Sequence, residues 1–390
     1  MNDNKPRRDM TRNYALTSLL CLTGLWAVQG CTDSDEEPTS LDRMEITMTD
    51  NDMVAIGDTK PLDVKGYDKE GNEVILSSIE WTAGNGNLSV DANGTVTGLQ
   101  EGNTEVKATT EGVETAATLR VRSDSSSVIE IYVSDAASFN TGPYKIMRYE
   151  ASADYPTEFI TERLSWPQDI LFLEEQGIVL VSNLSSGQIN AHDIITGRYL
   201  RTFAGGIGGP TRMKIGPDGL LYVLQWEGNG RVRRYNLDGT QAGTFTSTGV
   251  SQSIGMDWDA EGNLYVSSFG DKTVTKFDTN GDEVSELITS NLQGPTNLWI
   301  DESGDVLVLD WTAGLVRRFG SDGTYKGVFI SGLSKPEGVD FFGGSIFIGN
   351  GGTGAVKRFG GNGFYTEDVV PAGTGGLQTP NAVVVRKVEL

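Results

Sequence analysis

The stretch GPTRMKIGPDGLLYVLQWEGNGRVRRYNLDG, residues 209–239, decides the fold, because it recurs as GPTNLWIDESGDVLVLDWTAGLVRRFGSDG at residues 294–323. In each copy a strand follows the proline, and a tight turn leads to a strongly apolar strand. An irregular loop then leads to a third strand, and a second tight turn leads to an outer strand. Alternating apolar residues bounded by Gly, Asp and Asn turns predict four short strands per copy.

The same unit runs through most of the chain. Its opening residue recurs 41 to 44 positions apart, at Pro167, Pro210, Ser253, Pro295, Pro336 and Pro380. Self-similarity near forty residues with four strands per unit is typical of a β-propeller. The fifty glycines of the 390-residue chain fit such a turn-rich, all-β protein.

The two ends of the repeat region complete one further unit. Residues 129–160 read as the second to fourth strands of a blade, and residues 379–387 read as a first strand. Joining them closes the ring and removes free sheet edges. We therefore predict a six-bladed β-propeller over residues 128–390. The repeat resembles the NHL-repeat propellers and, more distantly, the gluconolactonase and streptogramin-lyase propellers, whose functions are diverse.

An additional all-β unit is expected before the propeller, over residues 41–122. Short alternating strands separated by Gly, Asn and Asp predict a β-sandwich. The run WTAGNGNLSVDANGTVTGLQEGNTEVKAT, which begins at Trp81, resembles the bacterial Ig-like group 2 family. The resemblance implies a spacer or adhesion module in which Trp81 belongs to the core. The run SDSSS, residues 123–127, is expected to be a flexible joint.

Residues 1–30 are expected to be a targeting segment rather than part of the fold. Basic residues precede an apolar run at 15–28, which is typical of a secretory leader. The leader ends in VQGC, which resembles the lipobox of bacterial lipoproteins and implies lipidation at Cys31. Residues 31–40 form an acidic linker resembling the surface-export signal of Bacteroidetes lipoproteins. The alternative is an ordinary leader followed by an incidental cysteine.

Charge and composition exclude several classes of function. The net charge of −22 argues against a nucleic-acid partner. The only histidine, His192, falls in an aromatic column of the third strands, a position expected to pack between blades. The other cysteine, Cys21, lies in the leader, so acid–base catalysis by histidine and cysteine nucleophiles are not expected. Five of the third strands also carry a cation in the position before this column, and these cations are expected to pair with carboxylates on neighbouring blades: Arg148, Arg234, Lys276, Arg318 and Arg358.

Function is expected where the repeated units differ. The residues after each proline and the loops after each second strand converge on one end of the central channel, the top face, and loops on a rigid scaffold carry function. Amides, carboxylates and aromatic rings there suit a polar ligand with C–H faces, such as a sugar. The alternative is that the rings pack the blade tops. The predicted binding residues are Gln168, Asp169, Thr211, Arg212, Gln225, Trp226, Phe269, Asn297, Asp310, Trp311, Glu337, Asn350 and Asn381.

A metal-dependent enzyme is the rival hypothesis. The resemblance to gluconolactonase-like propellers implies a divalent ion such as Ca²⁺, held here by Glu337, Asn297, Asn381 and Asp310, with Asp169 nearby. The sequence motifs that flank the metal ligands in that family are missing here, and Asn297 lies one position away from the position that matches a family ligand. No cofactor is therefore expected. We expect a monomeric, lipid-anchored envelope protein that binds a glycan, a peptide or an envelope protein, and a scaffolding role is the third alternative.

Overall fold

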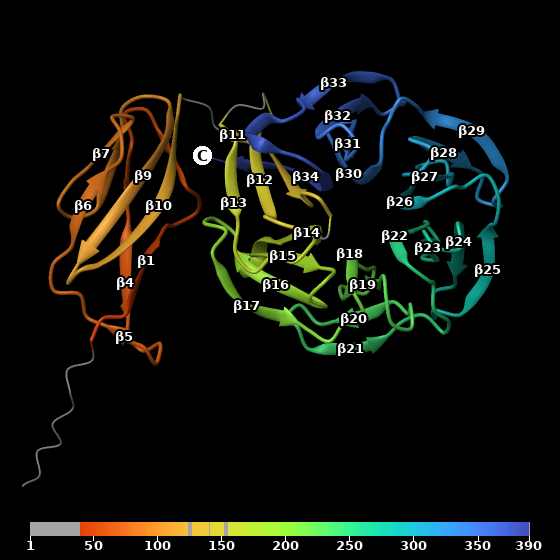
Figure 1. Cartoon of the computed structure of the whole chain (residues 1–390), viewed down its shortest axis with the longest axis horizontal. Coiled ribbons are helices and arrows are strands. Elements are labelled where there is room, and N and C mark those ends of the chain that lie inside the picture. The colour runs from red at the N-terminus through yellow and green to blue at the C-terminus, as the bar shows by residue number, and fades with distance from the viewer. Residues whose placement is uncertain (1–39, 124–126, 140, 152–154, 390) are drawn as a thin grey trace, which may run out of the picture. The chain divides into compact units, whose positions relative to one another are not determined.

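The computed structural model describes residues 40–123, 127–139, 141–151 and 155–389 (Figure 1). The predicted leader, the lipidation site Cys31 and almost all of the acidic linker lie outside these residues. No helix in the described ranges is long and apolar enough to cross a membrane. Residues 41–390 form one compact unit, within which ten strands precede a ring of four-stranded sheets.

The ten N-terminal strands form three small sheets, with the orders β1-β4-β5, β2-β10-β9-β6 and β3-β8-β7. Their bounds are β1 Arg43–Thr47, β2 Met53–Ala55, β3 Thr59–Pro61, β4 Asp63–Tyr67, β5 Glu73–Val74, β6 Glu80–Ala83, β7 Leu88–Val90, β8 Thr95–Gly98, β9 Gly102–Thr110 and β10 Val113–Arg122. Buried side chains alternate along β9, as expected for a sheet with one face on the core.

The turn between β7 and β8 explains the shared sequence motif of this region. Asp91 accepts hydrogen bonds from the backbone N–H groups of Asn93 and Thr95, both at 2.9 Å. Gly94 adopts a φ of +81°, and a Cβ atom there would lie 2.6 Å from the ring of Trp81. The turn therefore needs glycine at position 94 for two reasons: the left-handed conformation and the close packing against Trp81. Trp81 packs against the core as predicted.

Six four-stranded sheets form the ring. We number the blades in chain order from Pro167 and call the innermost strand the first. Blade 1 has β14 Pro167–Leu173, β15 Ile178–Asn183, β16 Gln188–Asp193 and β17 Tyr199–Ala204. Blade 2 has β18 Pro210–Ile215, β19 Leu221–Gln225, β20 Arg233–Tyr235 and β21 Gln241–Thr244. Blade 3 has β22 Ser253–Trp258, β23 Leu264–Ser268, β24 Thr273–Phe277 and β25 Glu283–Ile288.

The remaining blades follow the same plan. Blade 4 has β26 Pro295–Ile300, β27 Val306–Asp310, β28 Leu315–Phe319 and β29 Tyr325–Ile330; blade 5 has β30 Pro336–Phe342, β31 Ser345–Asn350, β32 Ala355–Gly360 and β33 Tyr365–Val370. Blade 6 has β34 Pro380–Glu389, β11 Ser127–Asp135, β12 Lys145–Glu150 and β13 Thr157–Ile160. Two short 3₁₀ helices are described, Glu174–Gln176 and Thr374–Gly376.

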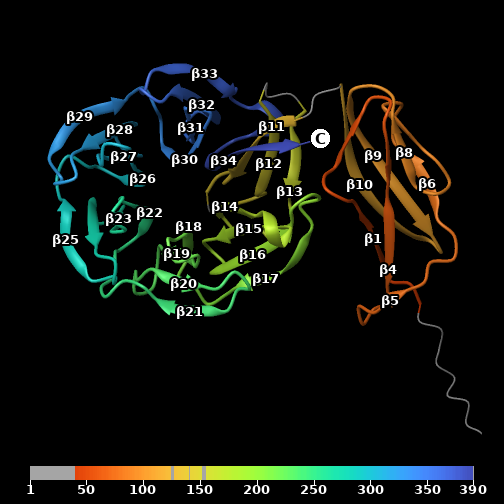
Figure 2. The ribbon, with the colours of Figure 1, turned by 180° about the vertical axis from the view of Figure 1, so that it is seen from behind.

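Blade 6 confirms the predicted closure by both ends of the repeat region. β34 pairs antiparallel with β11, and Ile131 faces Val385 in the register. Figure 2 shows the same ring from behind, with β34 beside β11. Pairing the two ends completes the four strands of blade 6, so backbone hydrogen bonds within one sheet close the ring.

The blades pack through the aromatic column of the third strands. Its members are all buried: Tyr149, His192, Tyr235, Phe277, Phe319 and Phe359. His192 contacts the backbone oxygen of Gly197 through Nδ1 at 3.1 Å, and its ring meets Tyr199 edge to face. Burial lowers the pKa of His192 to about 4. The histidine is therefore a neutral core residue, as predicted.

The cations beside that column do not pair as predicted. We expected partners on neighbouring blades, but within the propeller each partner lies on the same blade. Lys276 contacts Asp259 at 3.0 Å and Arg318 contacts Asp301 at 2.8 Å, both in the turn between the first two strands. The third strand of a blade runs antiparallel to the second strand. Its cation therefore lies beside the start of the second strand, next to the turn that holds the carboxylate. Arg148 is the exception and contacts Asp52 at 2.8 Å.

Asp52 belongs to a buried charge network that joins the N-terminal strands to blade 6. Arg120 contacts Asp52 at 2.7 Å and Glu130 at 2.5 Å, and Arg122 contacts Glu150 at 2.5 Å. Burial opposes ionisation of Asp52, but Arg148 and Arg120 outweigh it, so the pKa of Asp52 is lowered. The joint expected at residues 123–127 is therefore flanked on both sides by paired, buried charges.

Candidate functional site

A cavity of about 240 Å³ opens on the top face of the propeller, where the first strands begin. Aromatic and aliphatic side chains form most of its wall, with an amide, a hydroxyl and a carboxyl group among them. Its lining residues are Phe139, Trp166, Gln168, Leu184, Trp226, Ile254, Phe269, Thr296, Trp311 and Glu337. The cavity is smaller than the roughly 300–1,000 Å³ of most small-molecule sites, so it has room for one ring-sized group.

Three of the rings come from one repeat position, the residue that follows the second strand. Trp226 and Phe269 lie 5.6 Å apart with their planes tilted by 45°. Phe269 and Trp311 lie 6.1 Å apart, edge to face. All three are only partly buried. The alternative that these rings merely pack the blade tops is therefore incomplete, because each also presents surface to the cavity.

Two further rings were not predicted. Phe139 and Trp166 lie 6.2 Å apart and form another part of the wall. Trp166 stands directly before the repeat proline, and Phe139 lies in the loop after β11 of the blade shared by the two chain ends. Leu184 was also missed, although it occupies the same position after the second strand as Trp226. Aligning that column for all six blades would have identified it.

In four of the six blades the residue before the first strand has an unusual backbone. Trp166 has a φ of +54°, Gln252 of +46° and Lys335 of +51°, whereas Gly209 has the same conformation at +61°. This left-handed region costs roughly 1–2 kcal/mol for residues other than glycine. Such strain concentrates at functional sites. Here it directs Trp166 into the cavity wall, and it places Lys335 against two lining rings.

A single guanidinium, that of Arg212, supports the floor of the cavity, which Gln168 and Glu337 form. The Nη2 atom of Arg212 donates to Glu337 Oε1 at 3.3 Å and to the backbone oxygen of Asn381 at 3.0 Å. Its Nη1 atom donates to the backbone oxygen of Gln168. Arg212 thus connects blade 2 with blades 5, 6 and 1. Beneath this floor lies a wider channel of about 1,040 Å³, which Asp169, Arg212 and Asn297 line from different blades.

The amide of Gln168 completes the floor. With its oxygen and nitrogen oriented to satisfy their neighbours, Nε2 donates to Glu337 Oε1 at 3.3 Å. Its oxygen accepts from Trp166 Nε1 and from Asn381 Nδ2, each at 2.9 Å. Gln168 therefore links the aromatic wall to the charged floor.

Burial shifts the titration of both carboxyl groups near Arg212. Burial raises the pKa of Glu337 to about 7, although Arg212 lowers it in part. Burial likewise raises the pKa of Asp169 to about 6, and the carboxylate accepts from the backbone N–H of Met213 at 2.7 Å. The floor therefore changes its charge near neutral pH.

The polar residues at the ends of the second strands, which the sequence predicts to bind a ligand, accept hydrogen bonds from the backbone. Asp310 accepts from the backbone N–H groups of Gln293 at 2.9 Å and Gly294 at 3.0 Å. Asn350 accepts from Ser334 N–H at 2.6 Å, and Gln225 accepts from Gly208 N–H at 3.2 Å. Each side chain thus fixes the loop that precedes the first strand of its own blade.

Thr211 is also used internally. It is fully buried, and its hydroxyl donates to the backbone oxygen of Ser253 on the next blade at 2.7 Å. Asn297 accepts from the N–H of Leu298 at 3.0 Å and lines the lower channel rather than the aromatic cavity. Of the thirteen predicted residues, the structure brings these to the aromatic cavity: Gln168, Trp226, Phe269, Trp311 and Glu337.

The four metal candidates do not fit a divalent ion. Asp310 is fully buried, and its carboxylate is occupied by the backbone N–H groups of Gln293, Gly294 and Ala313 and by Arg317 Nε at 3.0 Å. Arg212 holds its positive charge against Glu337, which would repel a second cation. Among the described residues, no three His, Cys, Asp or Glu side chains are grouped as metal ligands.

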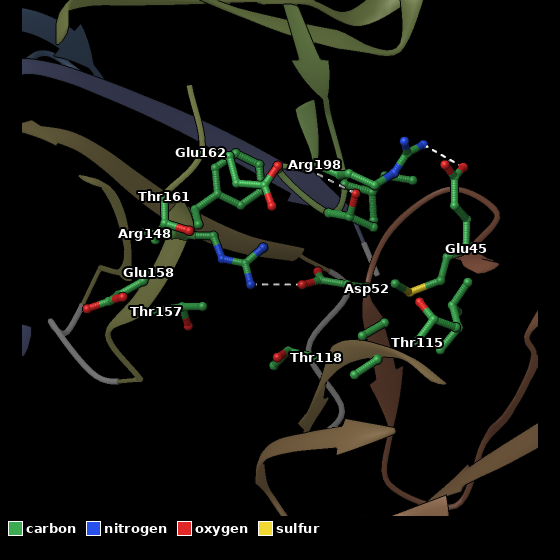
Figure 3. Close-up of a pocket in the computed structure, with 18 of the residues that line it drawn as sticks. Glu45, Asp52, Thr115, Thr118, Arg148, Thr157, Glu158, Thr161, Glu162 and Arg198 are labelled. Carbon is green, nitrogen blue, oxygen red and sulfur yellow. Dashed lines mark hydrogen bonds and ion pairs between the residues drawn. The ribbon is translucent and has the colours of Figure 1, made fainter. Parts of the chain in front are cut away.

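A second cavity, of about 330 Å³, lies between the N-terminal strands and blades 6 and 1 (Figure 3). Two ion pairs cross it, Asp52 with Arg148 at 2.8 Å and Glu45 with Arg198 at 2.9 Å. Its arginines are therefore already paired, and threonines make up much of the remaining polar surface. The top-face cavity is the better candidate for a ligand site.

Fold and site together define a β-propeller with a top-face cavity, preceded by an Ig-like domain. Residues 42–121 match the family model described as bacterial Ig-like domain (group 2), which confirms the resemblance for this segment. No curated protein sequence matches the chain.

Solved structures confirm the propeller. A chain of the nidogen/laminin complex is 17% identical with a TM-score of 0.55, and the match covers 66% of this chain and 98% of that chain. A protein of unknown function from Bacteroides caccae is 15% identical with a TM-score of 0.53 and the same coverage. At these identities the similarity shows the fold alone.

Proposed function

We propose that this protein is a cell-envelope lipoprotein whose propeller binds one anchor group of a glycan or peptide ligand in the top-face cavity. The observation that carries the proposal is the aromatic wall. Rings from five blades meet above a buried carboxyl group: Phe139, Trp166, Trp226, Phe269 and Trp311. Partly exposed rings around a concave site are the usual anchor-binding surface of proteins.

The size of the cavity restricts what enters it. A volume of about 240 Å³ exceeds the ~150 Å³ cavity that holds benzene in an engineered protein core. One side chain or one sugar ring therefore fits, and the rest of the ligand stays outside. The Ig-like domain serves as the spacer between the anchor and the propeller.

Ligand binding is tested by titrating the purified chain with a glycan array and a peptide library. Trp226→Ala and Trp311→Ala should each weaken binding by about tenfold or more, because large buried rings dominate such contacts. Phe364→Ala is the matched control, since this ring is 75% exposed on blade 5 and lines no described cavity. Equal affinity in all four proteins would refute the proposal.

The enzyme and scaffold alternatives give different results in the same preparation. A Ca²⁺-dependent rise in melting temperature that a chelator reverses and Glu337→Gln removes would favour the metal-dependent enzyme. Capture of an envelope protein that survives both tryptophan substitutions would favour the scaffold.

Lipid anchoring is tested separately. Cys31→Ser should abolish incorporation of a labelled fatty acid and release the protein from the membrane fraction. Cys21→Ser is the control, because this cysteine lies within the expected leader. Labelling that persists in the Cys31 variant would favour an ordinary secretory leader.

A further inference from the structure

Two charged residues flank the aromatic cavity on the same blade. Glu337 belongs to the floor, and Lys335 stands two positions earlier, directly before Pro336 and the start of β30. The two residues differ in burial and in pairing. Glu337 is buried and partly paired, whereas Lys335 is exposed and lies above two lining rings. These two residues identify the ligand chemistry within the function proposed above.

Lys335 presents an unpaired positive charge at the cavity. Its Nζ atom lies 5.1 Å from the ring centre of Trp311 and 5.6 Å from that of Phe139. Within the described residues it contacts no carboxylate, whereas Lys276 and Lys326 on blades 3 and 4 each do. In a chain of net charge −22, an ammonium group held without a counter-ion over aromatic rings is suited to an incoming anion.

Glu337 presents a hydrogen-bonding atom from the floor. Its Oε1 atom receives Arg212 and Gln168. Its Oε2 atom has no hydrogen-bond partner among the described residues, although the residue is only 8% exposed. A ligand group that donates a hydrogen bond would satisfy this oxygen. Above pH 7 the carboxylate is ionised, which strengthens such a bond.

The rest of the lining favours an aromatic group over a sugar ring. The indole N–H of Trp166 and both ends of the Gln168 amide are already paired. The hydroxyl of Thr296 donates to the backbone oxygen of Pro336 at 3.0 Å. A sugar would bring several hydroxyl groups, and each one left without a partner costs about 1–3 kcal/mol. An aromatic side chain brings none or one.

We propose that the cavity binds the C-terminal aromatic residue of a peptide, with the terminal carboxylate at Lys335 and a ring donor, as in tyrosine, at Glu337. The flat ring stacks among the indoles and phenyl groups, as aromatic pairs prefer. The two polar contacts fix its direction, so that the remainder of the peptide leaves through the mouth of the cavity. This inference rests on the proposed function and specifies its ligand.

Four peptides test both contacts. They share one body and end in Tyr or Phe, each as the free acid and as the amide. Fluorescence anisotropy at pH 8 gives their affinities for the full chain and for Lys335→Gln, Lys335→Arg and Glu337→Gln. We expect the Tyr acid to bind about tenfold more tightly than the Tyr amide and about tenfold more tightly than the Phe acid.

Each preference should depend on one residue only. Lys335→Gln should remove the preference for acid over amide and leave the preference for Tyr over Phe, and Lys335→Arg should restore the former. Glu337→Gln should remove the preference for Tyr over Phe and leave the preference for acid over amide. Equal binding of acid and amide by the unchanged protein, or an acid preference that survives in Lys335→Gln, would overturn the inference. Melting temperatures of the variants establish that each one is folded.

A glycan probe distinguishes failure of this peptide inference from failure of the proposed ligand binding in the top-face cavity. If a galacturonic-acid trimer binds, loses affinity with Trp226→Ala, and no peptide binds, the peptide inference fails and the top-face function stands. If neither the peptides nor glycans bind any better to the unchanged chain than to Trp226→Ala, both fail.

Discussion

Arg212 and Glu337 meet across the centre of the propeller, with Nη2 and Oε1 3.3 Å apart, although 125 positions separate them in the chain. Blades 2 and 5 stand opposite each other in a six-bladed ring, so the pair spans its axis. The contact lies between an aromatic upper cavity and a wider lower channel that apolar and charged side chains line together.

The first prediction concerns this pair. Arg212→Met should lower the free energy of unfolding by about 3–5 kcal/mol at pH 8, because it leaves the buried carboxylates of Glu337 and Asp169 without their counter-charge. Urea denaturation measures the change. Arg234→Met is the control, since its pair with Asp218 is partly exposed and should contribute about 0–1 kcal/mol. An equal loss in the free energy of unfolding for both variants would show that the pair of Arg212 and Glu337 has no special role.

The second prediction is a pH dependence of stability. Glu337 has a folded-state pKa of about 7 against an ordinary value of 4.5, so between these values the folded protein binds more protons than the unfolded one. Stability from this group is therefore fully present below about pH 4.5 and falls as pH rises toward 7, by at most about 1.4 kcal/mol per pH unit. Asp169, with a pKa of about 6, acts in the same direction between pH 4 and 6.

Glu337→Gln should flatten this dependence between pH 6 and 7.5, because the titrating group is gone while its shape is kept. Melting temperatures across pH 4–8 measure it. A profile identical to that of the unchanged protein would mean that Glu337 titrates normally. Glu367→Gln on the exposed side of blade 5 is the control, and it should leave the slope unchanged.

The third prediction concerns the backbone at Lys335. Lys335→Gly and Lys335→Ala both remove the ammonium group, but only glycine adopts a φ of +51° without strain. The glycine variant should be more stable than the alanine variant by roughly 1–2 kcal/mol. Chemical denaturation decides this. An alanine variant as stable as the glycine variant would mean that the left-handed conformation costs nothing there.

The fourth prediction separates loop fixation from ligand binding at Asp310. Asp310→Ala leaves three backbone N–H groups, one of them buried, and Arg317 without their acceptor, so it should destabilise the protein by about 3 kcal/mol or more. Asp322→Ala, at an exposed turn of the same blade, should cost much less. An Asp310 variant of normal stability that no longer binds ligand would restore the predicted binding role.

The aromatic positions could be predicted because they obey the repeat. Trp226, Phe269 and Trp311 each follow a second strand, and any propeller with that strand order brings this position to the top face. The polar position just before them could not be assigned in this way. Asp310 and Asn350 also point toward the top, but whether such a group faces a ligand or a loop depends on backbone N–H groups that lie sixteen or seventeen positions earlier.

Trp166 was missed for a different reason. The residue before a proline is normally extended, which would direct its side chain elsewhere. Its left-handed φ of +54° is imposed by the surrounding fold and has no local signal in the sequence. The same holds for Lys335, whose relation to the rings of Trp311 and Phe139 joins three blades.

By itself, the sequence determined the architecture: the strand order within a blade, the number of blades, their closure by both ends and the Ig-like segment before them. These follow from local periodicity and from the repeat, which neighbouring residues encode. Only the tertiary structure decided which polar groups are available to a ligand. That choice depends on contacts between residues far apart in the chain, such as Arg212 with Glu337, and on burial, which fixes both their partners and their charge.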